Sequence, residues 1–178
     1  MKTTIYRLLF ALSIALSSPQ LFAHGANNVE IFYSHETNGD DYISGVGIGY
    51  TFADPSSKLG YQLTTSLNNA EVIATDGFVE DYVAWEGGIK LGLFSNLSLY
   101  VEAGIDLSEI LFHDLRYDEH DYYFSEYHDD FDAYLGVGAG IQAGPLKVTA
   151  FSRKREIDSK YWEAESEVFS GVQFSLSF

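Results

Sequence analysis

Cysteine is absent from the 178 residues of the chain, which excludes disulfide bonds, thiolate metal sites and attachment of lipid through a cysteine. After residue 23 there is no run of eighteen apolar residues, so we expect no α-helix that crosses a membrane. Basic residues are few, with 10 Lys and Arg against 26 Asp and Glu. This balance excludes nucleic acid as a partner, because binding to phosphates depends on cationic side chains.

The chain is instead rich in residues that favour β-strands, with 13 Tyr, 13 Phe and 16 Gly but only 3 Pro. Its first 23 residues have the features of a secretory signal peptide: Lys2 and Arg7, a short apolar core over Leu8–Leu16, and a cleavage site after Ala23. The alternative is an uncleaved anchor, but the core is shorter than the ~17 residues that a spanning helix needs. We expect residues 1–23 to be a signal peptide and residues 24–178 to form one domain.

Most of the last eleven residues alternate between apolar and polar side chains, which is the period of a β-strand with two different faces. One face carries Val168, Val172, Phe174, Leu176 and Phe178, and the other carries Gly171, Gln173, Ser175 and Ser177. A chain end is normally frayed and polar. An amphipathic strand that ends on Phe178 therefore predicts that the strand closes a barrel.

Seven earlier segments alternate in the same way, and they comprise residues 29–35, 42–52, 59–67, 83–93, 97–107, 131–143 and 146–155. Short connectors (53–58, 94–96, 143–145) alternate with longer ones (36–41, 68–82, 108–130, 156–165). Together these features predict an all-β, eight-stranded antiparallel up-and-down transmembrane β-barrel. The alternative is a soluble barrel or sandwich with an apolar interior. Large aromatics near the strand ends of the apolar face, and glycines on the polar face, favour the membrane barrel.

The polar face of the predicted strands carries charges of both signs: Glu30, Glu86, Lys90, Glu102, Asp106, Asp132, Lys147, Arg153, Arg155 and Glu167. Isolated buried charges are prohibitively costly, so we expect these side chains to form an ion-paired network inside the barrel. The network either fills the interior structurally or lines a narrow path for ions or protons. An eight-stranded barrel is filled by side chains, which favours the structural interpretation.

With its signal, eight strands and closing Phe178, the chain resembles the small bacterial outer-membrane barrels of the OmpX and OmpA transmembrane type. The resemblance implies a monomer in the outer membrane, with long loops extracellular and both termini periplasmic. It implies contacts with outer-membrane lipids and lipopolysaccharide, and insertion by the barrel assembly machinery, for which Val172, Phe174, Leu176 and Phe178 are the assembly signal. Members of this type act in adhesion, host interaction and envelope integrity, and none of these roles implies a cofactor.

The longest connector, Ser108–Asp130, is acidic and contains six aromatic residues: Phe112, Tyr117, Tyr122, Tyr123, Phe124 and Tyr127. Exposed aromatics among charges favour a recognition surface for a host or matrix ligand. Two alternatives are a solvated acidic loop and rings that merely pack together. Carboxylates and His113, His120 and His128 are metal-ligand types, but their spacing matches no dedicated metal loop, so we predict no metal site.

The segment His35-Glu36-Thr37-Asn38 resembles the His-x-Ser-Asn motif of barrel-shaped lipid A deacylases, with Thr37 in place of the serine nucleophile. A catalytic triad also requires an acidic partner for the histidine, and the sequence shows none for His35. We therefore expect no enzymatic activity and no catalytic residue. A lipid A or phospholipid modifying enzyme and a narrow ion channel are the alternative functions.

Overall fold

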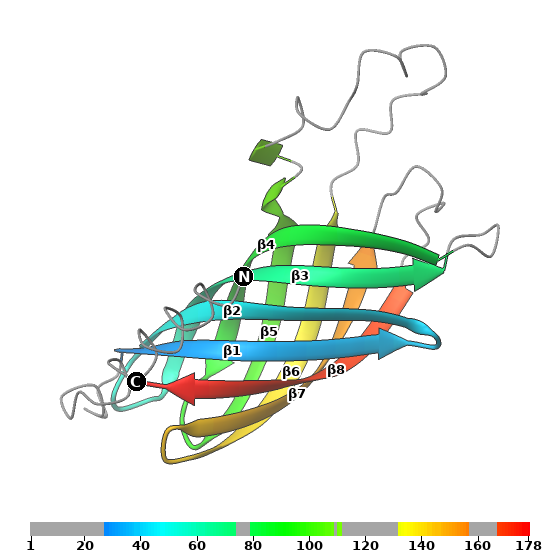
Figure 1. Ribbon diagram of the computed structural model, residues 1–178. Helices are drawn as coiled ribbons and strands as arrows, with labels where there is room; N and C mark the ends of the chain where they lie inside the picture. The colour runs from blue at the N-terminus through cyan, green and yellow to red at the C-terminus, as the bar shows by residue number, and fades with distance from the viewer. Residues whose placement is uncertain (1–26, 74–78, 109, 112–131, 157–166) are drawn as a thin grey trace, which may run out of the picture.

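The computed structural model describes residues 27–73, 79–108, 110–111, 132–156 and 167–178. These residues form eight antiparallel strands, each paired with the next along the chain, and β1 also pairs with β8 to close a barrel (Figure 1). The strands are β1 (Asn27–Asn38), β2 (Asp41–Ala53), β3 (Leu59–Ile73), β4 (Val79–Leu93), β5 (Leu97–Asp106), β6 (Ala133–Ala143), β7 (Leu146–Glu156) and β8 (Glu167–Ser177). The predicted fold class is confirmed.

The barrel closes where β8 meets β1, as the alternation of the last residues predicts. The register pairs Tyr33 with Phe174 and Ile31 with Leu176. Beyond the end of β8, the backbones of Val29 and Phe178 exchange hydrogen bonds of 3.2 Å and 2.8 Å. The final residue therefore lies within the ladder that joins the first and last strands.

The two faces of each strand have opposite environments, and β5 shows this most clearly. Its solvent-accessible residues point away from the barrel axis and are Leu97, Leu99, Val101 and Ile105. Its buried residues point into the interior, called the lumen below, and include Ser98, Tyr100, Glu102 and Asp106. The apolar face is thus outside and the polar face inside, which is the reverse of a soluble barrel and typical of a membrane barrel.

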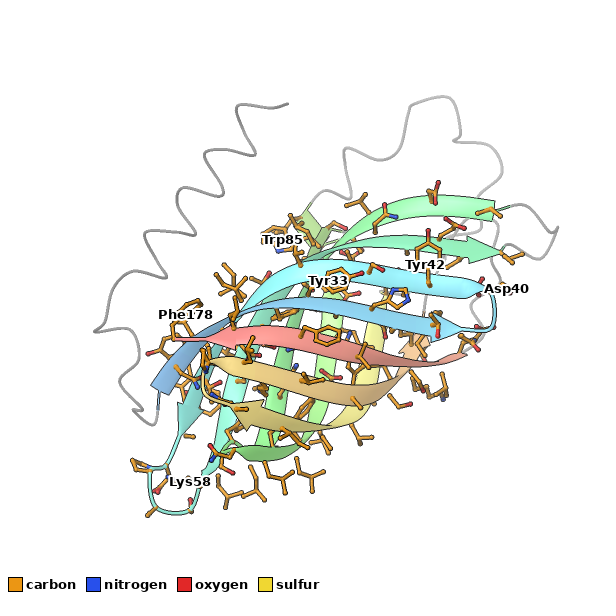
Figure 2. The ribbon with its side chains drawn as sticks, turned by 60° about the horizontal axis from the view of Figure 1, so that its bottom comes forward. Tyr33, Asp40, Tyr42, Lys58, Trp85 and Phe178 are labelled. Atoms are coloured by element: carbon orange, nitrogen blue, oxygen red, sulfur yellow. The ribbon has the colours of Figure 1, made fainter. Side chains whose placement is uncertain are left out.

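Connectors of different kinds gather at the two ends of the barrel. The turn end holds residues 54–58, 94–96, 144–145 and Phe178, and at the loop end β1, β3, β5 and β7 end and β2, β4, β6 and β8 begin. In Figure 2, Lys58 and Phe178 lie toward the turn end and Asp40 lies at the opposite, loop end. Gly39 and Gly144 are the first residues of two-residue turns, and their φ angles are 61° and 62°. Residues that carry a Cβ rarely adopt this backbone conformation.

Several strands are longer than their alternation predicts, so the boundaries of two connectors are corrected. The predicted connector 36–41 is a two-residue turn, because β1 continues to Asn38 and β2 begins at Asp41. The predicted connector 68–82 shrinks to residues 74–78, because β3 and β4 stay paired to Ile73 and Val79. Backbone pairing continues past the apolar belt, where side-chain alternation no longer marks the strand.

The β5–β6 connection differs from the prediction in a smaller way. Strand β5 ends at Asp106, and residues 107–108 and 110–111 are helical, whereas the alternation predicts a strand through Leu107. Within the described part of the chain, no helix has the length and hydropathy needed to cross a membrane. Strand β6 begins at Ala133 rather than Phe131, which lies outside the described residues.

The β2–β3 turn is organised by Asp54. Its carboxylate accepts hydrogen bonds from the backbone N–H groups of Ser56 and Ser57, at 2.6 Å and 3.0 Å, and another from the Ser56 hydroxyl. The Ser56 hydroxyl and these two amides lower the pKa of Asp54 to about 2, because they stabilise the ionised form. A side chain that binds backbone groups two and three residues ahead fixes a tight turn.

Candidate functional site

The central feature of the lumen is an ion-paired network built around two arginines of β7. Arg153 donates from Nε and Nη2 to the two carboxylate oxygens of Glu102, at 2.9 Å and 3.1 Å. Its third nitrogen, Nη1, lies 3.1 Å from Glu36 Oε1. Arg155 binds the same Glu36 oxygen at 2.5 Å and Glu86 at 2.7 Å. Three carboxylates from β1, β4 and β5 are therefore tied to one strand.

The network continues toward the turn end through Gln173. Lys90 lies 3.9 Å from Glu102 and donates to Gln173 Oε1 at 3.0 Å. The Gln173 amide then donates to Glu30 at 3.2 Å, and Lys147 lies 3.2 Å from the other Glu30 oxygen. Side chains of β1, β4, β5, β7 and β8 thus form a continuous chain of contacts along the lumen.

Within this network the charges balance. The ion-paired acids are Glu30, Glu36, Glu86 and Glu102, and the ion-paired bases are Lys90, Lys147, Arg153 and Arg155. All eight residues are buried. Neutrality matters because an uncompensated charge in such surroundings costs several kcal/mol.

Aromatic rings of the lumen lie against the cations and against glycines of neighbouring strands. The guanidinium carbon of Arg153 lies 4.5 Å from the Tyr134 ring centre and 4.3 Å from that of Phe151. A Cβ on Gly104 would lie 2.3 Å from the Tyr134 ring, and one on Gly138 would lie 2.4 Å from the ring of Tyr100. These glycines leave the space that the inward rings occupy, which explains why small residues follow the inner face.

Not every residue of the predicted network takes part in it. Asp106 accepts hydrogen bonds from the backbone and hydroxyl of Ser108, at 2.7 Å and 2.6 Å. Glu167 accepts a hydrogen bond from the Asn38 amide. Conversely, Glu36 joins both arginines although the sequence analysis assigns it to a connector. Glu36 was missed because the predicted first strand ends at His35. In a strand that continues to Asn38, Glu36 points to the same side as Glu30, which is the lumen.

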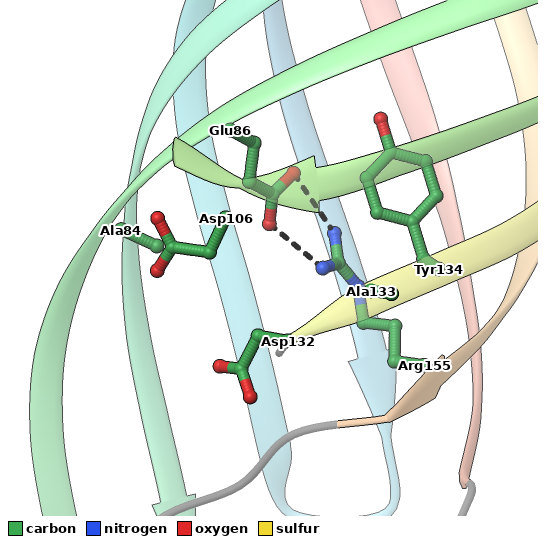
Figure 3. Close-up of a pocket in the computed structure, with 7 residues that line it drawn as sticks. All are labelled: Ala84, Glu86, Asp106, Asp132, Ala133, Tyr134 and Arg155. Carbon is green, nitrogen blue, oxygen red and sulfur yellow. Dashed lines mark hydrogen bonds and ion pairs between the residues drawn. The ribbon is translucent and has the colours of Figure 1, made fainter. Parts of the chain in front are cut away.

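A small pocket lies in the loop half of the lumen, lined by Ala84, Glu86, Asp106, Asp132, Ala133, Tyr134 and Arg155 (Figure 3). The Arg155–Glu86 ion pair forms part of its wall. The backbone N–H of Asp106 donates to the carbonyl of Asp132 at 2.8 Å, which holds the ends of the β5–β6 connection together. In the described ranges, no three His, Asp or Glu side chains are grouped so that they could hold a metal ion.

Near the loop end the lumen also contains an apolar cluster. Ile43, Ala70, Val72 and Phe169 form a buried cluster, and Phe169 has no exposed surface. These residues come from the loop-end parts of β2, β3 and β8. Ile43 is the register partner of Glu36, and Phe169 is that of Arg153, so the apolar cluster lies beside the ion-paired network.

The outer wall is apolar over most of its height. Leu135 and Ile141 are 67% and 68% exposed, and Leu97 is 66% exposed. Near the turn end, the ring of Phe52 lies 4.5 Å from that of Tyr50 and 4.7 Å from that of Tyr61. Trp85 also faces outward, and its indole N–H donates to the Thr65 hydroxyl at 2.7 Å, so this polar group is satisfied without water.

Strand register shows where the apolar wall ends. Three successive rows of outward side chains run across β7, β8, β1, β2, β3 and β4. In each row, every residue is the register partner of the next one. The row nearest the turn end is apolar and consists of Val148, Phe174, Tyr33, Val46, Leu67 and Trp85. The next, the boundary row, consists of Ala150, Val172, His35, Ser44, Asn69 and Val83. The third, the polar row, consists of Ser152, Ser170, Thr37, Tyr42, Glu71 and Asp81.

The boundary row contains a hydrogen-bonded His35–Ser44 pair. The two residues are register partners, and His35 Nδ1 lies 2.7 Å from the Ser44 hydroxyl oxygen. The ring centres of His35 and Tyr42 are 6.0 Å apart, and the Tyr42 hydroxyl donates to Glu71 at 2.5 Å. The resemblance to the His-x-Ser-Asn motif puts Thr37 in the position of a nucleophile for His35. The structure instead places the Ser44 hydroxyl against the imidazole.

The remaining predicted site residues have different outcomes. Val172 and Phe174 of the assembly signal are exposed on the outer wall, and Leu176 and Phe178 are half-buried. The six aromatic residues of the predicted recognition loop, Phe112, Tyr117, Tyr122, Tyr123, Phe124 and Tyr127, lie outside the described residues, as does the predicted signal peptide. The loop nevertheless starts and ends at known points, because β5 and β6 place its two ends at the loop end.

Comparisons with known proteins support the architecture. The fold is similar to the crystal structure of the N-terminal β-barrel domain of Pseudomonas aeruginosa OprF, with 16% sequence identity and a TM-score of 0.50. The match covers 87% of this chain and 100% of that one. Searches with protein-family models and among curated proteins found no match. The chain thus has the fold of an OmpA-type eight-stranded outer-membrane barrel.

Proposed function

We propose that this outer-membrane-type barrel is a monomeric anchor that presents its acidic, aromatic connector 108–130 outside the cell. The barrel would sit in outer-membrane lipid and lipopolysaccharide after insertion by the barrel assembly machinery. In this orientation the loop end is extracellular and both termini are periplasmic. The partner would be a host or matrix molecule with apolar and cationic groups, because the connector offers rings among carboxylates.

The observation that carries this proposal is the filled lumen. Four acids and four bases neutralise one another inside it, and the Ile43–Phe169 cluster packs beside Glu36 and Arg153, their register partners. Such an interior supports a stable anchor rather than a transport path, since eight strands leave room for side chains only. The apolar wall would be occupied by lipid. A partner in the water outside the cell would therefore contact the loop end of the barrel, where the longest connector begins and ends.

Combined alanine replacement of Tyr122, Tyr123, Phe124 and Tyr127 tests the proposal. We expect cells that display the variant to lose most of their binding to host cells or extracellular matrix. A matched control replaces Tyr50 and Tyr61, outward rings at the turn end, with leucine. It should bind as well as the wild type.

The variant must also remain folded at the surface, which its migration on a gel before and after boiling would establish. Unchanged adhesion by a folded, surface-displayed loop variant would contradict the proposed function.

A further inference from the structure

The His35–Ser44 pair of the boundary row has a geometry that structural support of the barrel does not require. Both side chains point outward on neighbouring strands, and both are half-buried. A hydroxyl oxygen 2.7 Å from an imidazole nitrogen is the arrangement in which histidine acts as general base toward a serine nucleophile. In the tautomer that carries its proton on Nε2, His35 Nδ1 accepts the hydroxyl proton.

The position of this pair determines which substrate it would meet. The neighbours toward the turn end are Tyr33 and Val46, which are 45% and 59% exposed on the apolar wall. The neighbours toward the loop end are Tyr42 and Glu71 of the polar row. In the proposed orientation a group at this level would lie where acyl chains join their headgroups, and outer-leaflet lipids carry acyl esters at that junction.

A third residue of the boundary row is suited to the same chemistry. Asn69 is the register partner of Ser44 on β3 and is exposed on the same face. Side chains directly opposite each other on an antiparallel pair have Cβ atoms about 5 Å apart. The Asn69 amide is therefore near enough to donate a hydrogen bond to an oxyanion that forms on a carbonyl attacked by Ser44.

We propose that His35, Ser44 and Asn69 form a site on the outer wall that hydrolyses fatty-acyl esters of membrane lipids. Ser44 Oγ attacks the ester carbonyl, and His35 takes the hydroxyl proton. The bond to the lipid alcohol then breaks, and His35 returns the proton to that leaving oxygen. Water, deprotonated by His35, releases the fatty acid and restores Ser44, so no other reactant is needed. This inference requires the outer wall to face lipid, as in the proposed function, but not recognition by the loop.

The test uses the full chain, purified from membranes and reconstituted in two kinds of vesicle. One kind contains phosphatidylethanolamine alone, and the other contains lipopolysaccharide in a non-hydrolysable ether lipid. Fatty acids released from each are measured by mass spectrometry. Release from the first identifies a phospholipid ester as substrate, and release from the second identifies an ester of lipid A.

Variants Ser44→Ala and His35→Ala should release fatty acid at least about 100-fold more slowly than the wild type, the usual loss when a catalytic base or its nucleophile is removed. Ser170→Ala and Thr37→Ala are matched controls, because both carry outward hydroxyls in the adjacent polar row. Ser170 faces the Ser152 hydroxyl at 3.4 Å rather than an imidazole. Both controls should keep the wild-type rate.

Labelling with a fluorophosphonate, which reacts with activated serines, gives a readout that does not depend on the choice of lipid. Peptide mapping should place the label on Ser44 in the wild type and find none there in His35→Ala. All variants are compared by heat-dependent gel migration, so loss of folding is distinguished from loss of chemistry. A folded wild-type protein that releases no fatty acid and leaves Ser44 unlabelled would overturn the inference, as would activity that persists in Ser44→Ala.

Discussion

Arg153 and Glu102 form a two-bond contact inside the barrel, with Nε and Nη2 of the arginine 2.9 Å and 3.1 Å from the two carboxylate oxygens. The residues belong to β7 and β5, which are separated by β6 in the sheet. Their contact therefore ties together strands that share no backbone ladder. Because a planar guanidinium matches a carboxylate, this pair also fixes the direction in which Arg153 approaches Glu36.

Removing one partner of this contact should be costly. In Glu102→Ala, Arg153 loses two hydrogen bonds and Lys90 loses its ion pair while both cations stay buried. We expect the free energy of unfolding to fall by about 3–5 kcal/mol, as for other broken buried pairs. Urea unfolding in lipid vesicles measures it. The matched control is Asp81→Ala, an exposed carboxylate of the outer wall, and an equal loss in the two variants would contradict the assigned role of Glu102.

The fit between Tyr100 and Gly138 predicts a different kind of defect. A Cβ on Gly138 would lie 2.4 Å from the ring and hydroxyl of Tyr100, so Gly138→Ala should destabilise the barrel by about 1–3 kcal/mol through overpacking. The penalty should disappear when Tyr100 is already alanine, because the clash is then absent. Ala139→Val, which adds methyl groups on the outer face, serves as control. If Gly138→Ala destabilised the wild type and the Tyr100→Ala variant equally, the Tyr100 ring would not be the reason for glycine at position 138.

Because side chains occupy the lumen, we expect the barrel not to conduct ions. Planar bilayers that contain the folded protein should show no steady single-channel current. The ion-paired side chains and the apolar Ile43–Phe169 cluster occupy the interior. Protein that has not been folded, added at the same concentration, controls for membrane leaks. Reproducible unit currents from the folded barrel would instead support the narrow channel considered from the sequence.

The turn at Asp54 should titrate at unusually low pH. Hydrogen bonds from Ser56 and Ser57 lower the pKa of Asp54 to about 2, so the turn keeps them at neutral pH and loses them as the pH falls through about 2. The NMR signals of the Ser56 and Ser57 amides should shift with that midpoint. In Asp54→Asn the shift should vanish. A midpoint near the ordinary value of about 4 would contradict the observed contacts.

Periodicity was enough to predict the fold because a strand with one face in lipid must alternate along its whole crossing. The inward position of Arg153, Arg155 and Glu102 follows directly from that parity. Strand ends were not predictable in this way, since near the loop end the pattern reverses: Ile43 and Val72 are buried inside, whereas their neighbours Tyr42 and Glu71 face outward. Glu36 was missed for that reason, although it binds both arginines.

The His35–Ser44 pair depends on register, which side-chain alternation does not give. Its register is set by the two-residue turn at Gly39–Asp40, which brings residues that lie nine positions apart face to face. Gly39 between Asn38 and Asp40 is a signal for such a turn, and reading it as one would have placed Ser44 opposite His35. The contacts of Asp106 with Ser108 depend on the helical turn after β5, for which the alternation gave no indication.

The central claim is that the outer wall faces lipid while the lumen is closed, and spin labelling along β5 tests it most directly. The chain contains no cysteine, so single cysteines can be introduced at each position from Leu97 to Ala103 without other changes. In bilayers, labels at positions 97, 99, 101 and 103 should be accessible to oxygen, which concentrates in lipid. Labels at 98, 100 and 102 should be shielded both from oxygen and from a water-soluble nickel complex. Uniform accessibility, or strong nickel access at the even positions, would contradict a lipid-facing wall around a filled lumen.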